Sequence, residues 1–572
     1  MKLLAKYLRP LLRSIAFGMT VKIVATLFEL GLPYILSYIM DELVPLHRVV
    51  PILIGGAAMI VAALAAMLGN VIANRNAAKV AREASRHIRH DLFEATMHLS
   101  SRQTDAFTVP SLESRLTSDT YNVHHFIGMM QRIGVRAPIL LLGGMIITLV
   151  LDFRLALIML AVLPLIGLSV FLITKRGMPL YRENQKAVDA MVRVVREDCQ
   201  GVRVIKALSK EDYENRRYDK ANADLSAKER HAGVTMAASQ PLMSLFLNLG
   251  LVAVIFLGAH FVNADLSKPG RIIAFIQYFT LMSTAMTTIT RIFVNYTKSV
   301  ASANRILEVL EASEDCRRSD AAPAAATEED FVVFDHVNFS YNGRKNNLTD
   351  ISFRLRRGGT LGIIGATGSG KTTLISLLMR FYDADSGSIR IGGEDLYAMD
   401  AERLHKMFGV VMQNDFISAD TVSENIRFGR DVSDESVRRA AALAQAADFI
   451  EAFPEGYEHR LTAKGTNVSG GQRQRLLIAR ALAGDPEILI LDDASSALDY
   501  KTDANLRCAI REELHTTTVV VAQRVSSVMF ADHILVLDHG RIIGAGTHEE
   551  LLEQCPAYRE ISDSQMGGAF LE

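Results

Sequence analysis

One eight-residue stretch has the residue types and the spacing needed to hold the phosphates of a nucleotide. It fits the pattern G-x-x-x-x-G-K-[ST] and consists of Gly365, Ala366, Thr367, Gly368, Ser369, Gly370, Lys371 and Thr372. Glycines let backbone N–H groups close around a phosphate, the lysine reaches the β- and γ-phosphates, and the threonine hydroxyl ligates Mg²⁺. The motif therefore predicts a nucleotide site with bound magnesium.

The flanking sequence supplies the elements that this motif needs. Residues 361–364 are apolar and predict a buried strand, and residues 373–381 predict a helix. The glycines then lie at a strand-to-helix turn, where the N-terminus of the helix adds positive potential. An ordinary glycine-rich turn that binds nothing does not require this context.

Three further polar residues lie in the same part of the chain, beside predicted strands. The Tyr341 ring can stack on a purine, and Gln413 can reach magnesium and the hydrolytic water. Asp492 ends the buried strand predicted over residues 488–492, where its carboxylate would hold the magnesium shell. Taken singly, a tyrosine or a glutamine is more often an ordinary surface or core residue, so the prediction rests on the combination.

A second anion-binding pattern follows Val468. It offers glycine amides and a serine hydroxyl just ahead of a predicted helix, in the residues Ser469, Gly470, Gly471 and Gln472. Backbone N–H groups at a helix start attract anions because the helix dipole is positive there. The chain thus carries two separate phosphate-binding signatures.

Composition indicates a membrane protein with more than one domain. The 572 residues are too many for one hydrophobic core. Hydrophobic residues make up 49% of the chain and the mean hydropathy is +0.18, which are high values for a soluble protein. The net charge of −1 gives no reason to expect a nucleic-acid partner. Metal-ligand spacing is missing from the cysteines, which are Cys199, Cys316, Cys508 and Cys555.

Six apolar runs long enough to cross a bilayer occur in the first 300 residues. They span about 14–40, 50–73, 126–151, 153–174, 240–262 and 272–296. Lysine and arginine concentrate in the connection after the second run and in the one after the fourth. The positive-inside rule then predicts a multi-pass protein of the cytoplasmic (inner) membrane, with both termini and these two connections in the cytosol.

The two long connections predict helices rather than flexible loops. Apolar positions recur at helical spacing over residues 77–99 and 181–206, so the membrane helices should continue into the cytosol. Each pair of extended helices is expected to end in a polar turn, at residues 100–105 and 209–217. These turns would contact a cytosolic motor domain.

A domain boundary follows the last apolar run, because residues 314–329 are small and polar and lack apolar periodicity. We therefore predict a multidomain fold. An all-α six-helix transmembrane domain occupies residues 1–312, a linker residues 313–330, and an α/β P-loop nucleotide-binding domain residues 331–572.

With the S-G-G-Q signature present, the chain resembles the ATP-binding cassette (ABC) transporters of the exporter type, over essentially its whole length. The resemblance implies an ATPase coupled to transport, with ATP and Mg²⁺ as cofactors, working as a dimer. Each ATP is held between the P-loop of one subunit and the signature of the other, and Ser496–Asp499 match the loop at the shared interface. The implied ATP-binding residues are Tyr341, Gly365 to Thr372, Thr373, and Ser469 to Gln472.

Two positions depart from the family pattern. After Asp492 the family has a glutamate as general base, whereas this chain has Asp493; where the family has a histidine beside the γ-phosphate, it has Gln523. With Gln413, these are the predicted catalytic positions, and Thr372, Gln413 and Asp492 are the predicted magnesium ligands. Poor hydrolysis at this chain's own site is expected.

In these departures the chain is similar to the degenerate-site subunit of bacterial heterodimeric multidrug exporters. The resemblance implies a second, different half-transporter as partner, and small hydrophobic or amphipathic compounds as substrates moved across the bilayer. An importer, a lipid or peptide transporter, and a membrane-anchored regulator or channel are the alternatives. Glu29, inside the first apolar run, either meets a cationic substrate or pairs with a neighbouring helix.

Overall fold

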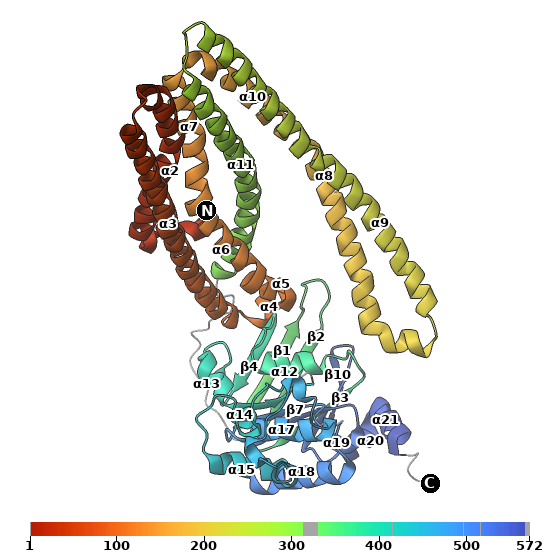
Figure 1. The fold of residues 1–572 in the computed structure, drawn as a ribbon. Helices are drawn as coiled ribbons and strands as arrows, with labels where there is room; N and C mark the ends of the chain where they lie inside the picture. Colours follow the sequence, from red (N-terminus) through yellow and green to blue (C-terminus); the bar gives the residue numbers. More distant parts are fainter. Residues whose placement is uncertain (1, 313–329, 414–415, 496, 515, 567–572) are drawn as a thin grey trace. The chain divides into compact units, whose positions relative to one another are not determined.

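The computed structural model describes residues 2–312, 330–413, 416–495, 497–514 and 516–566. The chain divides into two compact units (Figure 1). Unit 1 comprises Met1–His98 and Thr108–Ala312, and unit 2 comprises Leu99–Phe107 and Ser313–Glu572. The predicted linker, with Cys316, lies outside the described residues except for Asp330.

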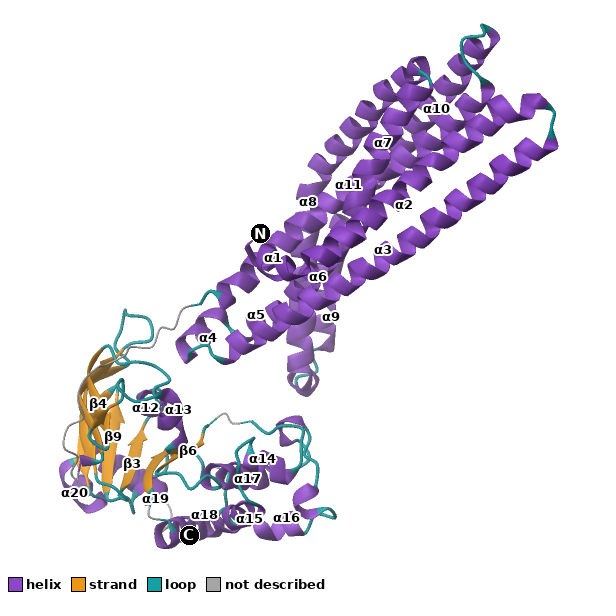
Figure 2. Cartoon of the chain, turned by 90° about the vertical axis from the view of Figure 1, so that its left-hand side faces the viewer, coloured by secondary structure: helices purple, strands orange, loops and turns teal. Residues whose placement is uncertain are grey.

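Unit 1 is built from helices (Figure 2). They are α1 (Lys2–Leu8), α2 (Leu12–Tyr38), α3 (Val49–Met97), α5 (Val109–Ser114), α6 (Thr120–Met129), α7 (Val135–Leu151), α8 (Phe153–Ala207), α9 (Glu211–Ala237), α10 (Ser239–Asn263) and α11 (Pro269–Leu310). Over the described residues, 6 helical stretches are long and apolar enough to cross a membrane, which confirms the six predicted runs.

Several of these stretches contain local irregularities in the helix. Five-residue π-helical segments lie at η2 (Ile39–Leu43), η4 (Arg115–Asp119) and η5 (Met130–Gly134). The third stretch runs through α5, η4, α6, η5 and α7, so its register shifts twice before it ends. Such segments redirect side chains relative to a regular α-helix, and they recur at functional positions.

The predicted extensions of the membrane helices are confirmed as continuous helix, because α3 and α8 run without a break through residues 77–97 and 181–207. The polar turn predicted at 209–217 is wrong, since α9 already begins at Glu211. Three acidic residues stand in the first turn of α9, where they are favourable near the positive end of the helix dipole. The connection between α8, which ends at Ala207, and α9 is therefore short.

The first tip also forms a helix, α4 (Ser101–Phe107), rather than a turn. The Ser100 hydroxyl accepts from the Gln103 amide at 3.1 Å, and the Gln103 side chain accepts from the Ser100 amide at 3.1 Å. This reciprocal pair is a capping box, which satisfies two amides that would otherwise lack partners at the helix start. Although the chain on both sides of α4 belongs to unit 1, α4 packs in unit 2.

Unit 2 contains two sheets. The four-stranded antiparallel sheet has the order β2-β1-β4-β5, with the bounds β1 (Val332–Phe339), β2 (Leu348–Leu355), β4 (Ser386–Ile391) and β5 (Glu394–Asp395). The six-stranded sheet has the order β10-β9-β3-β8-β7-β6 and is parallel except for β10. Its strands are β3 (Thr360–Gly365), β6 (Phe408–Val411), β7 (Ile488–Asp492), β8 (Thr517–Ala522), β9 (His533–Asp538) and β10 (Arg541–Gly546).

Helices and an apolar core hold these strands in place. The core includes Ile363 of β3, Ile490 of β7 and Val519 of β8, each 0% exposed, as expected for parallel strands covered on both faces. Besides α4, the α-helices of unit 2 among the described residues are α12 (Lys371–Leu378), α13 (Ala401–Lys406), α14 (Val422–Arg427), α15 (Asp434–Leu443), α16 (Ala447–Glu451), α17 (Gly470–Leu482), α18 (Tyr500–Glu513), α19 (Val525–Val528), α20 (His548–Gln554) and α21 (Pro556–Met566). The predicted α/β nucleotide-binding fold is confirmed.

Candidate nucleotide site

The glycine-rich turn joins β3 directly to α12, which begins at Lys371, two residues earlier than predicted. Gly370 has φ 105° and Gly368 has φ 82°, in the left-handed region where a side chain would be strained. A Cβ on Gly365 would lie 2.2 Å from the Leu537 carbonyl oxygen. The turn therefore needs glycine for conformation at two positions and for close packing at a third.

Lys371 and Thr372 stand at the start of α12 and face the turn and strand β7. The Lys371 ammonium donates to the carbonyl oxygens of Gly365 at 2.7 Å and Ala366 at 2.9 Å. Burial lowers the pKa of this lysine, and the carboxylates of Asp492 and Asp493 act in the opposite direction. The Thr372 hydroxyl donates to Asp492 Oδ2 at 3.5 Å, so the structure brings these two predicted magnesium ligands side by side.

A cavity of about 230 Å³ brings the predicted residues of this site together. Strands β7 and β8 are parallel neighbours, so the residues after them meet at one edge of the sheet. The lining includes Thr367, Gly368, Gly370, Lys371, Thr372, Thr373, Gln413, Asp492, Asp493 and Gln523. It also includes Asn347, which the sequence did not indicate because it lies in a turn without a motif.

Asp492 and Asp493 share this low-dielectric edge. Burial raises the pKa of Asp492, and the neighbouring Asp493 charge raises it further. Burial also raises the pKa of Asp493, opposed by Arg524 and Lys371. Asp493 has φ 54°, and its amide donates to the Val521 carbonyl oxygen at 2.9 Å. The backbone at Asp493 is thus fixed, and the side chain that extends from it is one methylene shorter than a glutamate.

Gln523 is held by a residue that sequence reasoning missed. The Gln565 side chain of α21 donates to the Gln523 carbonyl oxygen at 2.9 Å and accepts from the Val525 amide at 2.8 Å. The Gln565 side chain therefore hydrogen-bonds to two backbone positions of the loop after β8. No signal near residue 565 could have revealed this contact, because it joins residues 42 positions apart.

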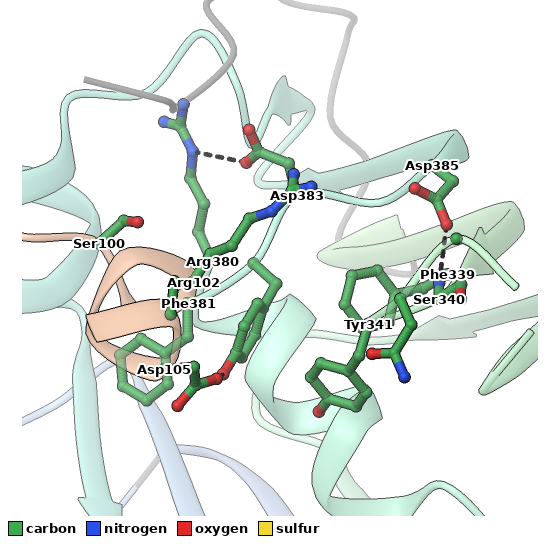
Figure 3. Close-up of a pocket in the computed structure, with 14 residues that line it drawn as sticks. Ser100, Arg102, Asp105, Phe339, Ser340, Tyr341, Arg380, Phe381, Asp383 and Asp385 are labelled. Carbon is green, nitrogen blue, oxygen red and sulfur yellow. Dashed lines mark hydrogen bonds and ion pairs between the residues drawn. The ribbon is translucent and has the colours of Figure 1, made fainter. Parts of the chain in front are cut away.

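Tyr341 stands at a second, larger pocket of about 460 Å³ in unit 2 (Figure 3). Its hydroxyl donates to Thr373 Oγ1 at 3.3 Å, and its ring meets Phe339 and Tyr382 edge-on, at centroid distances of 4.8 and 5.0 Å. The Tyr382 hydroxyl in turn donates to Asp105 of α4 at 2.5 Å. The predicted purine-stacking residue is thus linked through one aromatic ring to α4.

The S-G-G-Q signature lies elsewhere in unit 2. Ser469 caps α17 and forms a capping box with Gln472, whose amide donates to Ser469 Oγ at 3.2 Å. Ser469 and Gly470 are exposed, and a Cβ on Gly470 would meet open space. None of the four signature residues lines the cavity beside the P-loop. Of the interface loop at 496–499, Ser496 lies outside the described residues, and Asp499 caps α18.

Glu29 lies in unit 1, on α2. Its carboxylate forms a two-bond ion pair with the guanidinium group of Arg136 on α7. Of the two alternatives left by the sequence, the described structure contains the pairing with a neighbouring helix.

Two family models match the chain. The ABC transporter transmembrane region matches residues 15–286, and the ABC transporter model, which describes the ATP-binding domain, matches residues 348–496. In the solved structure of a bacterial Atm1-family ABC exporter with ATP bound, the fold is shared with a TM-score of 0.81 at 24% identity, over 98% of both chains.

Curated relatives match this chain over nearly its whole length. An uncharacterized ABC transporter ATP-binding protein of Mycobacterium tuberculosis is 34% identical over 575 residues, covering 98% of both chains. The uncharacterized ABC transporter ATP-binding protein YfiB of Bacillus subtilis is 32% identical over 563 residues, also covering 98% of both. The chain is therefore a member of the ABC transporter family, with a membrane domain and an ATP-binding domain in the arrangement of an exporter half-transporter.

Proposed function

We propose that this chain is the degenerate-site subunit of a heterodimeric ABC exporter that moves hydrophobic or amphipathic compounds, including drugs of several classes. The observation that carries the proposal is the pair of side chains beside the P-loop. Asp493 and Gln523 line the cavity that also holds Lys371, Thr372 and Asp492. These last three are the residues that we assign to phosphate and magnesium.

The chemistry of this pair favours ATP binding over ATP hydrolysis. An aspartate is one methylene shorter than a glutamate, so its carboxylate stands about 1.5 Å further from the attacking water. A glutamine can donate a hydrogen bond but cannot carry the proton or the positive charge of a histidine. Losing two transition-state contacts of about 2–3 kcal/mol each slows hydrolysis on the order of a thousandfold or more.

The signature supports a division of labour between two different subunits. Ser469 to Gln472 keep the family sequence at the start of α17, with Ser469 and Gly470 exposed, and none of the four lines the chain's own P-loop cavity. They would complete the ATP site of a partner that has glutamate and histidine at the two altered positions. We assign Tyr341 to the purine and Gln413 to the magnesium and the hydrolytic water.

The proposal also includes the domain bounds and the orientation of the chain in the membrane. We assign residues 1–312 to the transmembrane domain, 313–330 to the linker and 331–572 to the nucleotide-binding domain. The cationic connections support an orientation with both termini and unit 2 on the cytosolic side of the inner membrane.

Nucleotide trapping in the complex with its partner half-transporter tests this assignment. After several turnovers, we expect intact ATP at the site that contains Lys371 and ADP at the other site. The chain purified alone should turn over ATP at less than about 1 per second. Equal turnover at both sites, or rapid turnover by the chain alone, would contradict the proposal.

A further inference from the structure

An excess of positive charge is enclosed in the membrane part of unit 1. Lys22 on α2 is 4% exposed, and its ammonium donates to Asn70 Oδ1 at 2.6 Å and to Asn74 Oδ1 at 3.3 Å, both on α3. Both partners are neutral amides, so they solvate the charge without cancelling it. Among the described residues, no carboxylate lies within ion-pairing distance of Lys22.

Two arginines add to this charge. The charges of Arg136, Glu29 and Arg132 all act on the Lys22 ammonium. Glu29 is committed to Arg136, while Arg132 donates from Nε to the Gly128 carbonyl oxygen at 3.0 Å and has no carboxylate partner among the described residues. Three cations therefore share one anion, and the cluster of Lys22, Arg132, Arg136 and Glu29 retains a net charge of two positive units.

The backbone brings this basic cluster together from three segments. Lys22 and Glu29 are seven residues apart on α2, two helical turns, and so lie on one face. Arg132 lies in the π-helical segment η5, which packs against both α2 and α3, and Arg136 follows one turn later on α7. An irregular segment at this position aims a charged side chain where a regular helix would not.

The cluster is both deep and accessible. Counted from the end of α2 at Tyr38, Glu29 lies about 14 Å and Lys22 about 24 Å into a hydrocarbon core of about 30 Å. In the proposed topology this places Glu29 near the midplane and Lys22 in the half nearer the cytosol. The Arg136 side chain is 37% exposed and Arg132 is partly exposed, so a ligand can reach their guanidinium groups.

We propose that the basic cluster binds the anionic head group, a carboxylate or a phosphate, of an amphipathic molecule whose apolar part lies among the membrane helices. A compensating anion offsets the cost of holding unpaired cations in an apolar medium. Guanidinium groups suit this role because they bind carboxylate and phosphate with two parallel hydrogen bonds. The inference rests on the proposed function, since it names the substrate class of the same transporter, and it reverses the cationic preference expected from Glu29 alone.

The test compares three fluorescent probes that share a twelve-carbon tail and differ only in the head group: carboxylate, primary amide or trimethylammonium. Binding is measured to the complex of this chain with its partner in nanodiscs of phosphatidylcholine, without ATP, so that the result does not depend on which site hydrolyses. We expect the carboxylate probe to bind about tenfold or more tightly than the amide probe, and the trimethylammonium probe to bind most weakly.

Two variants that remove charges of opposite sign distinguish a role in ligand binding from a structural role. Lys22→Met should weaken carboxylate binding about tenfold, whereas Glu29→Gln should strengthen it and should weaken trimethylammonium binding further. Arg132→Gln, at a partly exposed position, repeats the Lys22 test if the buried substitution prevents folding. Thr26→Val, on the same face of α2 and 0% exposed, is the control that leaves the charge unchanged. Equal losses for all three probes, or no dependence on head group, would overturn the proposal.

A second arm identifies the source of the anion. Adding phosphatidylglycerol to the nanodiscs should leave carboxylate binding unchanged if a transported substrate occupies the cluster, and should compete with it if a lipid head group does. Both results support an anion site. A failed nucleotide-trapping experiment together with intact head-group selectivity would reject the division of ATP sites while leaving the anion site in place.

Discussion

Two helices of unit 2 start at phosphate-binding signatures, and their surroundings differ. The start of α12 is enclosed: Lys371 bonds to the loop carbonyls, and Asp492, Asp493, Gln413 and Gln523 line the same cavity. The start of α17 is open, because Ser469 is satisfied by its own capping box and Gly470 faces free space. The first is a pocket within one chain, whereas the second needs a ligand held on another surface.

Both departures from the family pattern, Asp493 and Gln523, lie at the enclosed site. The enclosed site keeps the groups that we assign to phosphate and magnesium and alters the two positions that we assign to the chemical step. The open site is unaltered. This distribution of substitutions is expected under the proposal that a different subunit supplies the competent catalytic pair.

The largest expected effect comes from blocking the open site. Ser469→Arg adds bulk and charge where the proposed partner's ATP would lie, and should reduce ATPase activity of the complex at least about a hundredfold. Nucleotide binding at this chain's own P-loop should be unchanged, as photolabelling of that site would report. The matched control is Ser433→Arg, since Ser433 caps α15 in the same way but belongs to no signature. Retained ATPase in the Ser469 variant would remove the basis for a shared site.

A smaller effect is expected from repairing the enclosed site. Asp493→Glu alone should raise hydrolysis only a few-fold, because Gln523 still lacks a titratable ring. Asp493→Glu combined with Gln523→His should raise it on the order of a hundredfold, since two transition-state contacts return together. The measurement is trapped ADP at the site containing Lys371, in the complex with its partner. Additive few-fold gains would show that these two positions do not limit the chemical step.

Sequence alone predicted those parts of the molecule that depend on local pattern. Runs of apolar residues predicted the membrane helices, and the strand before Gly365 together with the helix after it predicted the turn at the P-loop. Contacts between residues far apart in the sequence could not be predicted in this way. Gln565 bonds to the loop at Gln523, and Arg136 pairs with Glu29, 107 positions away, and neither contact leaves a periodic trace in the sequence.

Side-chain capping explains the local errors. The tip at 100–105 was predicted to be a turn from its polar composition, yet Ser100 and Gln103 form a capping box that starts a helix. At the second tip, acidic residues just after Lys210 start α9 earlier than expected. Composition describes the solvent exposure of such segments, whereas hydrogen bonds and the helix dipole decide their conformation.

The smallest expected effect concerns the link between the enclosed site and α4. Tyr382→Phe keeps the aromatic ring that meets Tyr341 edge-on but removes the hydroxyl that donates to Asp105. One hydrogen bond contributes about 0.5–1.5 kcal/mol, so we expect a two- to tenfold weaker coupling between ATP turnover and transport. Transport per ATP hydrolysed, measured in proteoliposomes, should fall while ATPase activity is retained.

Tyr397→Phe is the control for that change, because it also removes the hydroxyl of a half-buried tyrosine in unit 2, one that accepts from the Ala384 amide at 2.8 Å. A general loss of stability would lower ATPase activity and transport together in both variants. A selective loss of transport only in Tyr382→Phe would mean that α4 senses the nucleotide through the ring between Tyr341 and Asp105. The enclosed site would then serve the transport cycle through ATP binding, as the proposed slow hydrolysis at this site requires.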